Sequence, residues 1–318
     1  MLLVNGRWRD WKKKWRTRKI ANKGYSFFEL DGKQVAVRNS TGELTEVINT
    51  TVPIGSIIYT PEQQEEYKKK QERKNALYWQ KQCNKELGKF FFIDKNEDFS
   101  SLSPATVTKL IYLNTYLSYS DNLLKLTQRT PMKYEDLPGV LKISEKSVQR
   151  FWNEVSPKYI VRTDEGLMFT NLSIFIRGQT NRSKYYQKIY NDGIRLLYDN
   201  TPISKHKNLG YLFKMIPLIN IEYNILCENP DEDILEKVKP ITLSDFCKII
   251  GYNETQLSRL VNTYNKIKFN VNGKMERFCA FVYDGLDRTN ANIIINPRIL
   301  YSGINYKKVE ILGLFYRD

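Results

Sequence analysis

The stretch "MKYEDLPGVLKISEKSVQRFWNEV" (residues 132–155) decides the fold of this chain. We expect a short helix from Tyr134, a break near Gly139 and a second helix after Ser144, a good N-cap residue. The second helix has one apolar face, at the i, i+3, i+4 and i+7 positions: Val148, Phe151, Trp152 and Val155. Its other face carries hydrogen-bond donors: Lys146, Ser147, Gln149, Arg150 and Asn153. The pattern fits a helix-turn-helix that reads DNA, and it equally fits two helices of an ordinary core.

Residues 241–264 ("ITLSDFCKIIGYNETQLSRLVNTY") have the same length and align with residues 132–155 without a gap. Four positions are identical: Asp136 and Asp245, Glu145 and Glu254, Arg150 and Arg259, Asn153 and Asn262. Apolar positions also match: Leu137 with Phe246, Val140 with Ile249, Val148 with Leu257, and Phe151 with Leu260. Asn253 replaces Ser144 as the N-cap residue, with Gln256 placed for a capping box. Because the identical residues include surface types that core packing does not require, the repeat predicts two tandem helix-turn-helix modules.

The neighbours of the first repeat extend the pattern. Upstream, "SPATVTKLIYLNTYLSY" (103–119) predicts a helix capped by Ser103, with Pro104 in its first turn. Its apolar residues at helical spacing are Val107, Leu110, Ile111 and Leu117. Downstream, "KYIVRTDEGLMFTNLSIFIRG" (158–178) predicts a β-hairpin with its turn at 164–166. Helix, helix, turn, helix and hairpin is the order of a winged helix.

The second repeat has matching neighbours. Upstream, "NLGYLFKMIPLINIEYNIL" (208–226) predicts a long apolar helix. Downstream, "KIKFNVNGKMERFCAFVYDG" (266–285) predicts a second wing, with strands around Asn272–Gly273. The expected fold class is therefore mainly α with small β-hairpins (α+β), built as two tandem winged helix-turn-helix domains behind a basic N-terminal region.

The chain divides into five expected parts. Residues 1–59 form a basic region with a hairpin, "YSFFEL" (25–30) and "KQVAVR" (33–38), around Asp31–Gly32. Residues 60–88 predict a connecting helix, since a proline stands at its first position and a glycine at its end. The remaining parts are a first winged-helix domain at 89–190, a second at 191–303 and a C-terminal tail at 304–318.

The charge of the chain indicates a polyanionic partner. The 318 residues carry a formal net charge of +15, with a sequence pI near 9.4. Residues 7–19 ("RWRDWKKKWRTRK") hold eight Lys or Arg against one acid, and their tryptophans form one stripe if the segment is helical. An anionic membrane surface is one partner for such a stripe. We prefer a basic arm on DNA, with contacts from Arg7, Arg9, Lys12, Lys13, Lys14 and Arg16.

The exposed faces of the two predicted recognition helices supply the base-reading candidates. Arginine binds guanine at two points in the major groove, and Gln or Asn does the same with adenine. The candidates are Lys146, Ser147, Gln149, Arg150 and Asn153 in the first helix and Thr255, Gln256, Ser258 and Arg259 in the second. The predicted wings add cations for phosphate contacts: Lys158, Arg162, Lys266, Lys268 and Lys274. For any single member of these sets, a solvated surface side chain is the alternative.

The sequence contains few of the residues and motifs that common enzyme classes require. His206 is the only histidine, and we expect it at the surface of the basic segment "SKHKN". No P-loop, G-x-S-x-G or H-E-x-x-H motif occurs, so we expect neither catalysis nor a cofactor, although a metal-carboxylate nuclease stays open. The widely spaced cysteines are expected to be buried free thiols: Cys83, Cys227, Cys247 and Cys279. No apolar run reaches the ~18 residues of a membrane span, and we expect a cytoplasmic, nucleoid-associated protein without membrane contact.

Three segments in order, "LSPATVTKLIYLNTYLSYSDNLL" (102–124), "LKISEKSVQRFWNEV" (141–155) and "LSIFIRG" (172–178), carry a resemblance. Together they resemble winged-helix DNA-binding proteins of phages and plasmids of low-GC Gram-positive bacteria, over roughly residues 89–303. The resemblance implies that Lys146, Ser147, Gln149 and Arg150, together with their equivalents in the second repeat, read bases. It implies double-stranded DNA as partner, with a second copy of the chain as a further candidate.

The resemblance leaves the biological role between three alternatives. The first is a transcriptional regulator of a mobile element, which we favour. The tandem arrangement is also similar to plasmid replication initiators, which bind repeated origin sequences with two winged helices. The third alternative is a protein–protein adaptor that uses winged helices as interaction surfaces.

Overall fold

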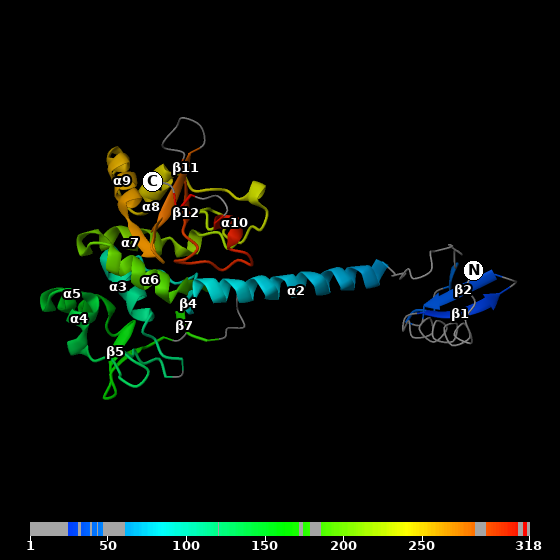
Figure 1. The fold of residues 1–318 in the computed structure, drawn as a ribbon, viewed down its shortest axis with the longest axis horizontal. Helices are drawn as coiled ribbons and strands as arrows, with labels where there is room; N and C mark the ends of the chain where they lie inside the picture. Colours follow the sequence, from blue (N-terminus) through cyan, green and yellow to red (C-terminus); the bar gives the residue numbers. More distant parts are fainter. Residues whose placement is uncertain are drawn as a thin grey trace. The chain divides into compact units, whose positions relative to one another are not determined.

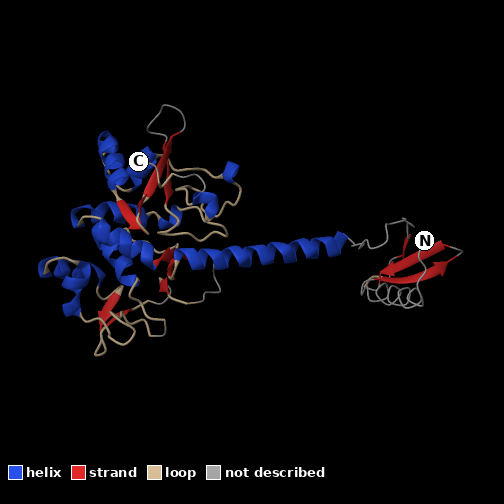
Figure 2. Cartoon of the chain, in the orientation of Figure 1, coloured by secondary structure: helices blue, strands red, loops and turns tan. Residues whose placement is uncertain are grey.

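The computed structural model describes residues 25–30, 33–38, 40–42, 44–46, 61–119, 121–171, 174–178, 186–283, 291–310 and 314–316. The chain divides into two compact units, Met1–Tyr67 and Lys68–Asp318. The protein contains helices and short antiparallel strand pairs (Figures 1 and 2). Its fold class is therefore α+β, as the sequence predicts.

The N-terminal unit contains a small antiparallel sheet in the order β1-β2-β3. Its strands are β1 (Tyr25–Leu30), β2 (Lys33–Arg38) and β3 (Leu44–Glu46). Tyr25 pairs with Arg38 and Leu30 with Lys33, so the predicted hairpin is confirmed. Its turn, Asp31–Gly32, lies outside the described residues.

Helix α2 (Pro61–Leu87) confirms the predicted connecting helix. The helix ends at Leu87, and the N–H of the next residue, Gly88, donates to the Asn84 carbonyl at 3.2 Å. Gly88 has a φ of +86°, a left-handed conformation that glycine adopts without steric cost. Most of the described side chains of α2 are exposed, but Cys83 and Leu87 are buried among apolar side chains from later parts of the chain. The last turn of α2 therefore belongs to the core of Lys68–Asp318.

The first half of Lys68–Asp318 contains β4 (Phe90–Asp94), α3 (Pro104–Asn114), α4 (Leu137–Leu141), α5 (Glu145–Val155), β5 (Ile160–Arg162), β6 (Leu167–Phe169) and β7 (Phe175–Ile176). A 3-10 turn, Tyr134–Asp136, precedes α4. The Ser103 side chain caps α3 by accepting the Thr106 N–H, as predicted. Leu117, expected on α3, lies beyond its end and forms an antiparallel bridge with Leu124.

The break between the two helices of the first repeat is at Lys142, and the prediction of a break near Gly139 is wrong. Gly139 lies inside α4, because the buried Leu137 and Leu141 on either side hold that helix against the core. Lys142 has a φ of +55° and donates its N–H to the Pro138 carbonyl, which ends α4 and turns the chain into α5.

The second half contains β8 (Tyr186–Tyr190), α6 (Asn191–Asn200), α7 (His206–Lys214), α8 (Leu243–Ile249), α9 (Leu257–Lys266), β9 (Lys268–Val271), β10 (Lys274–Arg277), β11 (Cys279–Tyr283), β12 (Ala291–Ile295) and α10 (Lys307–Glu310). Its 3-10 turns are Ile203–Lys205, Ile216–Leu218, Leu235–Lys237 and Glu254–Gln256. The prediction of one long helix over 208–226 is wrong, because α7 ends at Lys214. Pro217 explains the end, since proline has no N–H to give and restricts the residue before it.

The predicted repeat is present in the backbone. Asn122 and Asn224 both have positive φ, 56° and 54°, and their carbonyls accept the N–H groups of Phe169 and Ile295 at 3.1 and 3.0 Å. The turns between the paired helices also correspond, since Gly251 has a φ of +65° at the position of Lys142. The two halves therefore repeat the order helix, helix, turn, helix, hairpin.

The second hairpin requires a correction. Strands β9 and β10 do pair around Asn272–Gly273, but they do not take the place of β5 and β6. In the first half the Leu124 N–H bonds the Leu167 carbonyl of β6 at 2.8 Å, and in the second the Leu226 N–H bonds Ile293 of β12 at 2.9 Å. The equivalent of β5–β6 is thus β11–β12, and β9–β10 is an insertion between α9 and that hairpin.

The halves meet at a seam of strands and helices. Strand β4 is the middle strand of the sheet β7-β4-β8 and pairs antiparallel with β8, with Phe92 opposite Lys188. Helix α3 packs directly on α7, where a Cβ on Gly210 would overlap the carbonyl oxygen of Pro104. Apolar side chains from both halves join in one continuous core, so the halves form a single compact unit.

Candidate nucleic-acid interface

Helix α5 presents the polar face that the sequence predicts. Val148, Phe151 and Val155 are buried in the core, which fixes the opposite face toward solvent. On that face the exposed candidates are Lys146, Gln149, Arg150 and Asn153, and Ser147 is half-buried beside them. Ser144 occupies the N-cap position, but its hydroxyl bonds the Ser147 hydroxyl at 3.1 Å and caps no backbone N–H.

The two cations of this face have no protein partner in the described part of the chain. Neither the Lys146 ammonium nor the Arg150 guanidinium forms a hydrogen bond or an ion pair there. Both charges are therefore free for an acidic ligand. By contrast, Lys158 of the predicted wing is engaged, with its Nζ 2.8 Å from the Tyr159 hydroxyl and 3.4 Å from Glu97 Oε1.

Gln149 is held by two side-chain hydrogen bonds. The Tyr134 hydroxyl donates to Gln149 Oε1 at 3.1 Å, and Gln149 Nε2 donates to Asn153 Oδ1 at 3.0 Å. Tyr134 comes from the 3-10 turn before α4, so the bond ties the two helices of the repeat together on their solvent side. We call Tyr134, Gln149 and Asn153 the amide relay.

Arg162 joins the hairpin β5–β6 to helix α5 and to the turn before α4. Its Cζ lies 3.5 Å from the centroid of the Tyr134 ring and 4.9 Å from that of Trp152. The two rings meet edge to face, 5.2 Å apart at 87°. Cation–π attraction of this kind is worth ~0.5–1 kcal/mol at exposed sites. Arg162, a predicted phosphate ligand, is exposed, and its guanidinium stacks on the ring of Tyr134, the first member of the amide relay.

The sequence analysis missed Tyr134 as a site residue. The signal that would have found it is a departure from the repeat. Leu243 and Val261 stand at the positions of Tyr134 and Trp152, so two aliphatic positions of one half are aromatic in the other. Exchanging buried aliphatic residues for large rings with polar edges suggests a surface role.

The candidate face of the second repeat is exposed, as predicted. Thr255, Gln256, Ser258 and Arg259 lie at the surface of the turn Glu254–Gln256 and of α9. Asn253 caps the turn through the Thr255 N–H at 3.0 Å and accepts the Thr255 hydroxyl at 2.8 Å. This Thr255 bond takes the place of the expected capping box with Gln256. The Arg259 guanidinium has no partner among the described residues.

The second hairpin carries different chemistry from the first. Phe281 pairs with Ile293 where Arg162 pairs with Leu167, and its ring packs 6.1 Å from Tyr264. Lys268 and Lys274 lie on the inserted β9–β10 pair, where Lys274 is exposed and Lys268 half-buried, and Lys266 ends α9. Two of the three predicted wing cations of this half are therefore on the insertion, and none is on the hairpin that is equivalent to β5–β6.

The candidates of the basic N-terminal segment, Arg7, Arg9, Lys12, Lys13, Lys14 and Arg16, lie outside the described residues.

His206 is buried, and the expectation of a surface histidine is wrong. Its Nε2 lies 2.9 Å from the Thr201 carbonyl and 3.2 Å from that of Tyr198, and Thr108 of α3 donates its hydroxyl to the His206 carbonyl. Burial lowers the pKa of the imidazole, so it is neutral at physiological pH. His206 is a structural residue of the seam.

The cysteines are free and buried, as predicted. Burial raises the pKa of the Cys83 and Cys227 thiols to about 11, which keeps both protonated and unreactive at neutral pH. In the described ranges, no three His, Cys, Asp or Glu side chains gather as a metal site. None of the described helices combines the length and apolar character needed to cross a membrane.

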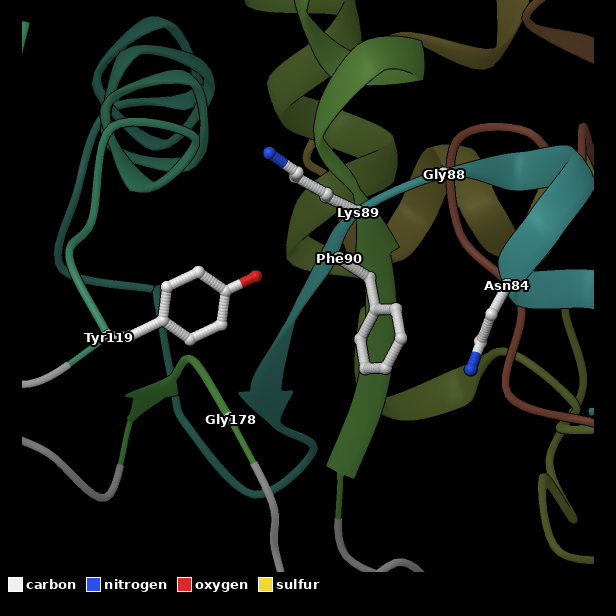
Figure 3. A pocket seen from close by; sticks show the side chains of 6 residues that line it. All are labelled: Asn84, Gly88, Lys89, Phe90, Tyr119 and Gly178. Atoms are coloured by element: carbon white, nitrogen blue, oxygen red, sulfur yellow. The ribbon is translucent and has the colours of Figure 1, made fainter. Parts of the chain in front are cut away.

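A hollow of about 300 Å³ lies at the end of α2, where Figure 3 shows the Phe90 and Tyr119 rings on opposite sides. It is lined by Asn84, Gly88, Lys89, Phe90, Tyr119 and Gly178. The Arg177 guanidinium lies 4.4 Å from the Tyr119 ring centroid. Its side chains are Asn84, Lys89, Phe90 and Tyr119, and this set does not indicate a particular chemistry.

No protein-family model, curated protein or solved structure matches this chain. The functional conclusion therefore rests on the residues of the site.

Proposed function

We propose that Lys68–Asp318 is a tandem winged-helix module and that the protein binds double-stranded DNA sequence-specifically. The observation that supports this most is the repeated polar face. In each half a helix after a positive-φ turn exposes an arginine without a protein partner in the described part of the chain, Arg150 or Arg259, at the same position. An ordinary two-helix corner does not require that coincidence.

The chemistry of these faces suits the major groove. The groove admits one α-helix, and an arginine fork matches the two acceptors of guanine. Lys146 and Arg162 lie on or beside the first face, where they are placed for phosphate or base contacts. Because one chain carries two different readers, the preferred site is expected to have two unlike half-sites about one helical turn apart.

The role we propose is transcriptional control of a mobile element. Initiation of replication at repeated origin sequences uses the same chemistry, and the position of the binding sites separates the two: one promoter, or an array of repeats. A protein–protein adaptor would show no salt-dependent DNA affinity, and a metal-carboxylate nuclease would nick supercoiled plasmid in the presence of a divalent metal.

The test is selection of bound fragments from random and genomic DNA by the full chain at near-physiological salt, followed by sequencing. We expect a two-part motif in the parent and its loss in the Arg150→Ala, Arg259→Ala double variant. Both arginines are exposed, so the thermal unfolding of the double variant should match that of the parent. A selection that enriches no motif contradicts specific DNA binding.

A further inference from the structure

The amide relay leaves Gln149 with a defined set of unused hydrogen-bonding groups. A glutamine amide has two acceptor positions on its oxygen and two N–H donors on its nitrogen. Tyr134 occupies one acceptor position and Asn153 one donor. One acceptor and one N–H therefore stay free of the relay on an exposed side chain.

The remaining acceptor position and N–H of the Gln149 amide are complementary to the major-groove edge of adenine. In the major groove, adenine presents the N6 amino group as donor and N7 as acceptor, and a glutamine amide bonds both at once. Guanine presents two acceptors, thymine a methyl group and one acceptor, and cytosine one amino donor, so none of the three satisfies both groups of the amide. An amide fixed in this orientation favours adenine.

The relay is itself supported. The Tyr134 hydroxyl donates from a ring whose centroid lies 3.5 Å from the Arg162 Cζ and 5.2 Å from the centroid of the Trp152 ring, which it meets edge to face. Trp152 packs in turn against the core cluster. The Gln149 amide is thus ordered before any ligand arrives, which lowers the entropic cost of binding.

The second half has no counterpart among its described residues. Ser258 stands at the position of Gln149, the buried Leu243 at that of Tyr134, and Phe281 at that of Arg162. In the described part of the chain, the amide relay is therefore present in the first half and has no equivalent in the second.

We propose that Gln149 reads one adenine in the major groove, and that Tyr134 and Asn153 are positioning residues that hold its amide for this contact. The inference deepens the proposed function and rests on it. It places the adenine in the half-site bound by α5.

The experiment uses the full chain and the DNA site found by selection. Each adenine of the site is replaced in turn by 7-deazaadenine, which pairs normally but has a C–H in place of the N7 acceptor. In the parent, we expect one position at which this replacement weakens binding by about fivefold or more, since a bidentate contact is worth ~1–3 kcal/mol. In Gln149→Ala the replacement should have no effect at that position.

Tyr134→Phe removes the hydroxyl and keeps the ring under Arg162. We expect it to bind the unmodified site with a modest reduction in affinity, while the 7-deazaadenine penalty at the same position falls to about twofold or less. Asn153→Ala, an exposed change on α5, should reduce the penalty in the same way. A relay that only stabilised the fold would leave the penalty at its parental size.

Matched controls are Gln80→Ala and Tyr78→Phe, the same chemical changes at exposed positions of α2. Both should retain the full penalty. A specific motif whose 7-deazaadenine penalties are the same in Gln149→Ala as in the parent overturns the adenine contact and leaves the proposed function standing. A penalty that Tyr134→Phe and Asn153→Ala both leave unchanged overturns the positioning roles. Selection without any motif overturns the proposed function and this inference together.

Discussion

The two halves of Lys68–Asp318 share a backbone framework and differ in the side chains placed on it. Asn122 and Asn224 make the same left-handed turn and accept the same strand N–H, and the turns before α5 and α9 correspond. On the surface, the first half stacks Arg162 on Tyr134 while the second buries Leu243. The framework places a helix, and the side chains decide what that helix contacts.

The residues that hold the two halves together are separate from those that differ between their exposed faces. The exposed faces are free to diverge because the seam is built from other residues, on α3, α7, β4 and β8. A change at the seam should therefore affect both halves, and a change on one face only that half.

The largest effect is expected from Gly210→Ala, which breaks the seam. The new methyl would overlap the Pro104 carbonyl oxygen, and neither helix backbone can move aside without disturbing the shared core. We expect a decrease of about 3 kcal/mol or more in the free energy of unfolding, measured by chemical denaturation.

Gly139→Ala is the matched control. Gly139 lies inside α4, and beyond its own helix backbone and chain neighbours no atom lies within 4 Å of the added methyl. Alanine in a helix interior is better than glycine by ~0.5–1 kcal/mol, so this variant should be slightly more stable than the parent. Equal destabilisation by the two variants would contradict the tight α3–α7 contact.

Next in size are the two arginines that we propose read bases, Arg150 and Arg259. Arg150→Ala and Arg259→Ala should each cost about 1–3 kcal/mol in affinity for the selected site and relax base preference at one position. Since the two side chains share no partner among the described residues, the two effects should add in the double variant, measured by titration of labelled DNA. If both single variants bind as the parent does, the assignment of the reading faces is wrong.

The framework was largely predictable from the sequence, because its signals are local. The apolar period of α5, the Ser103 cap and the match between 132–155 and 241–264 all depend on residues close in the chain. Spacing and capping follow from helix geometry alone, so these predictions are confirmed.

The parts that sequence reasoning missed depend on partners far along the chain. His206 stands in a basic run, and nothing near it reveals that its carbonyl accepts the hydroxyl of Thr108. Two hairpins follow α9 in succession with similar strand signals, and only the bond from Leu226 to Ile293 shows which one matches β5–β6. Tyr134 takes its role from Gln149 and Arg162, which come from two other elements.

A smaller effect is expected from removing residues 1–20, which hold the basic candidates outside the described residues. If this segment binds phosphate, its removal should weaken binding to all sequences alike. The log–log salt slope should fall by ~0.9 for each phosphate that the shortened chain no longer neutralises. Titrations of specific and random duplexes at several salt concentrations separate this from a change in base preference, which would contradict a phosphate-binding arm.

The smallest effect concerns the seam again, through His206, where α7 begins. Burial lowers the pKa of this imidazole in the folded protein below its usual value near 6.5. As pH falls below 6.5 the unfolded chain takes up a proton that the folded chain refuses, so stability is present above this pH and declines as pH falls. The decline is at most about 1.4 kcal/mol for each pH unit.

His206→Gln separates this titration from the packing, because a glutamine N–H is able to donate to the Thr201 and Tyr198 carbonyls and carries no titrating group. We expect the unfolding free energy of the parent to decrease between pH 7 and 5.5, and the variant to show a flatter dependence over the same interval, by denaturation at each pH. Parallel curves would assign the pH dependence to other groups. A flatter curve with DNA specificity intact would place His206 in the seam and outside both reading faces.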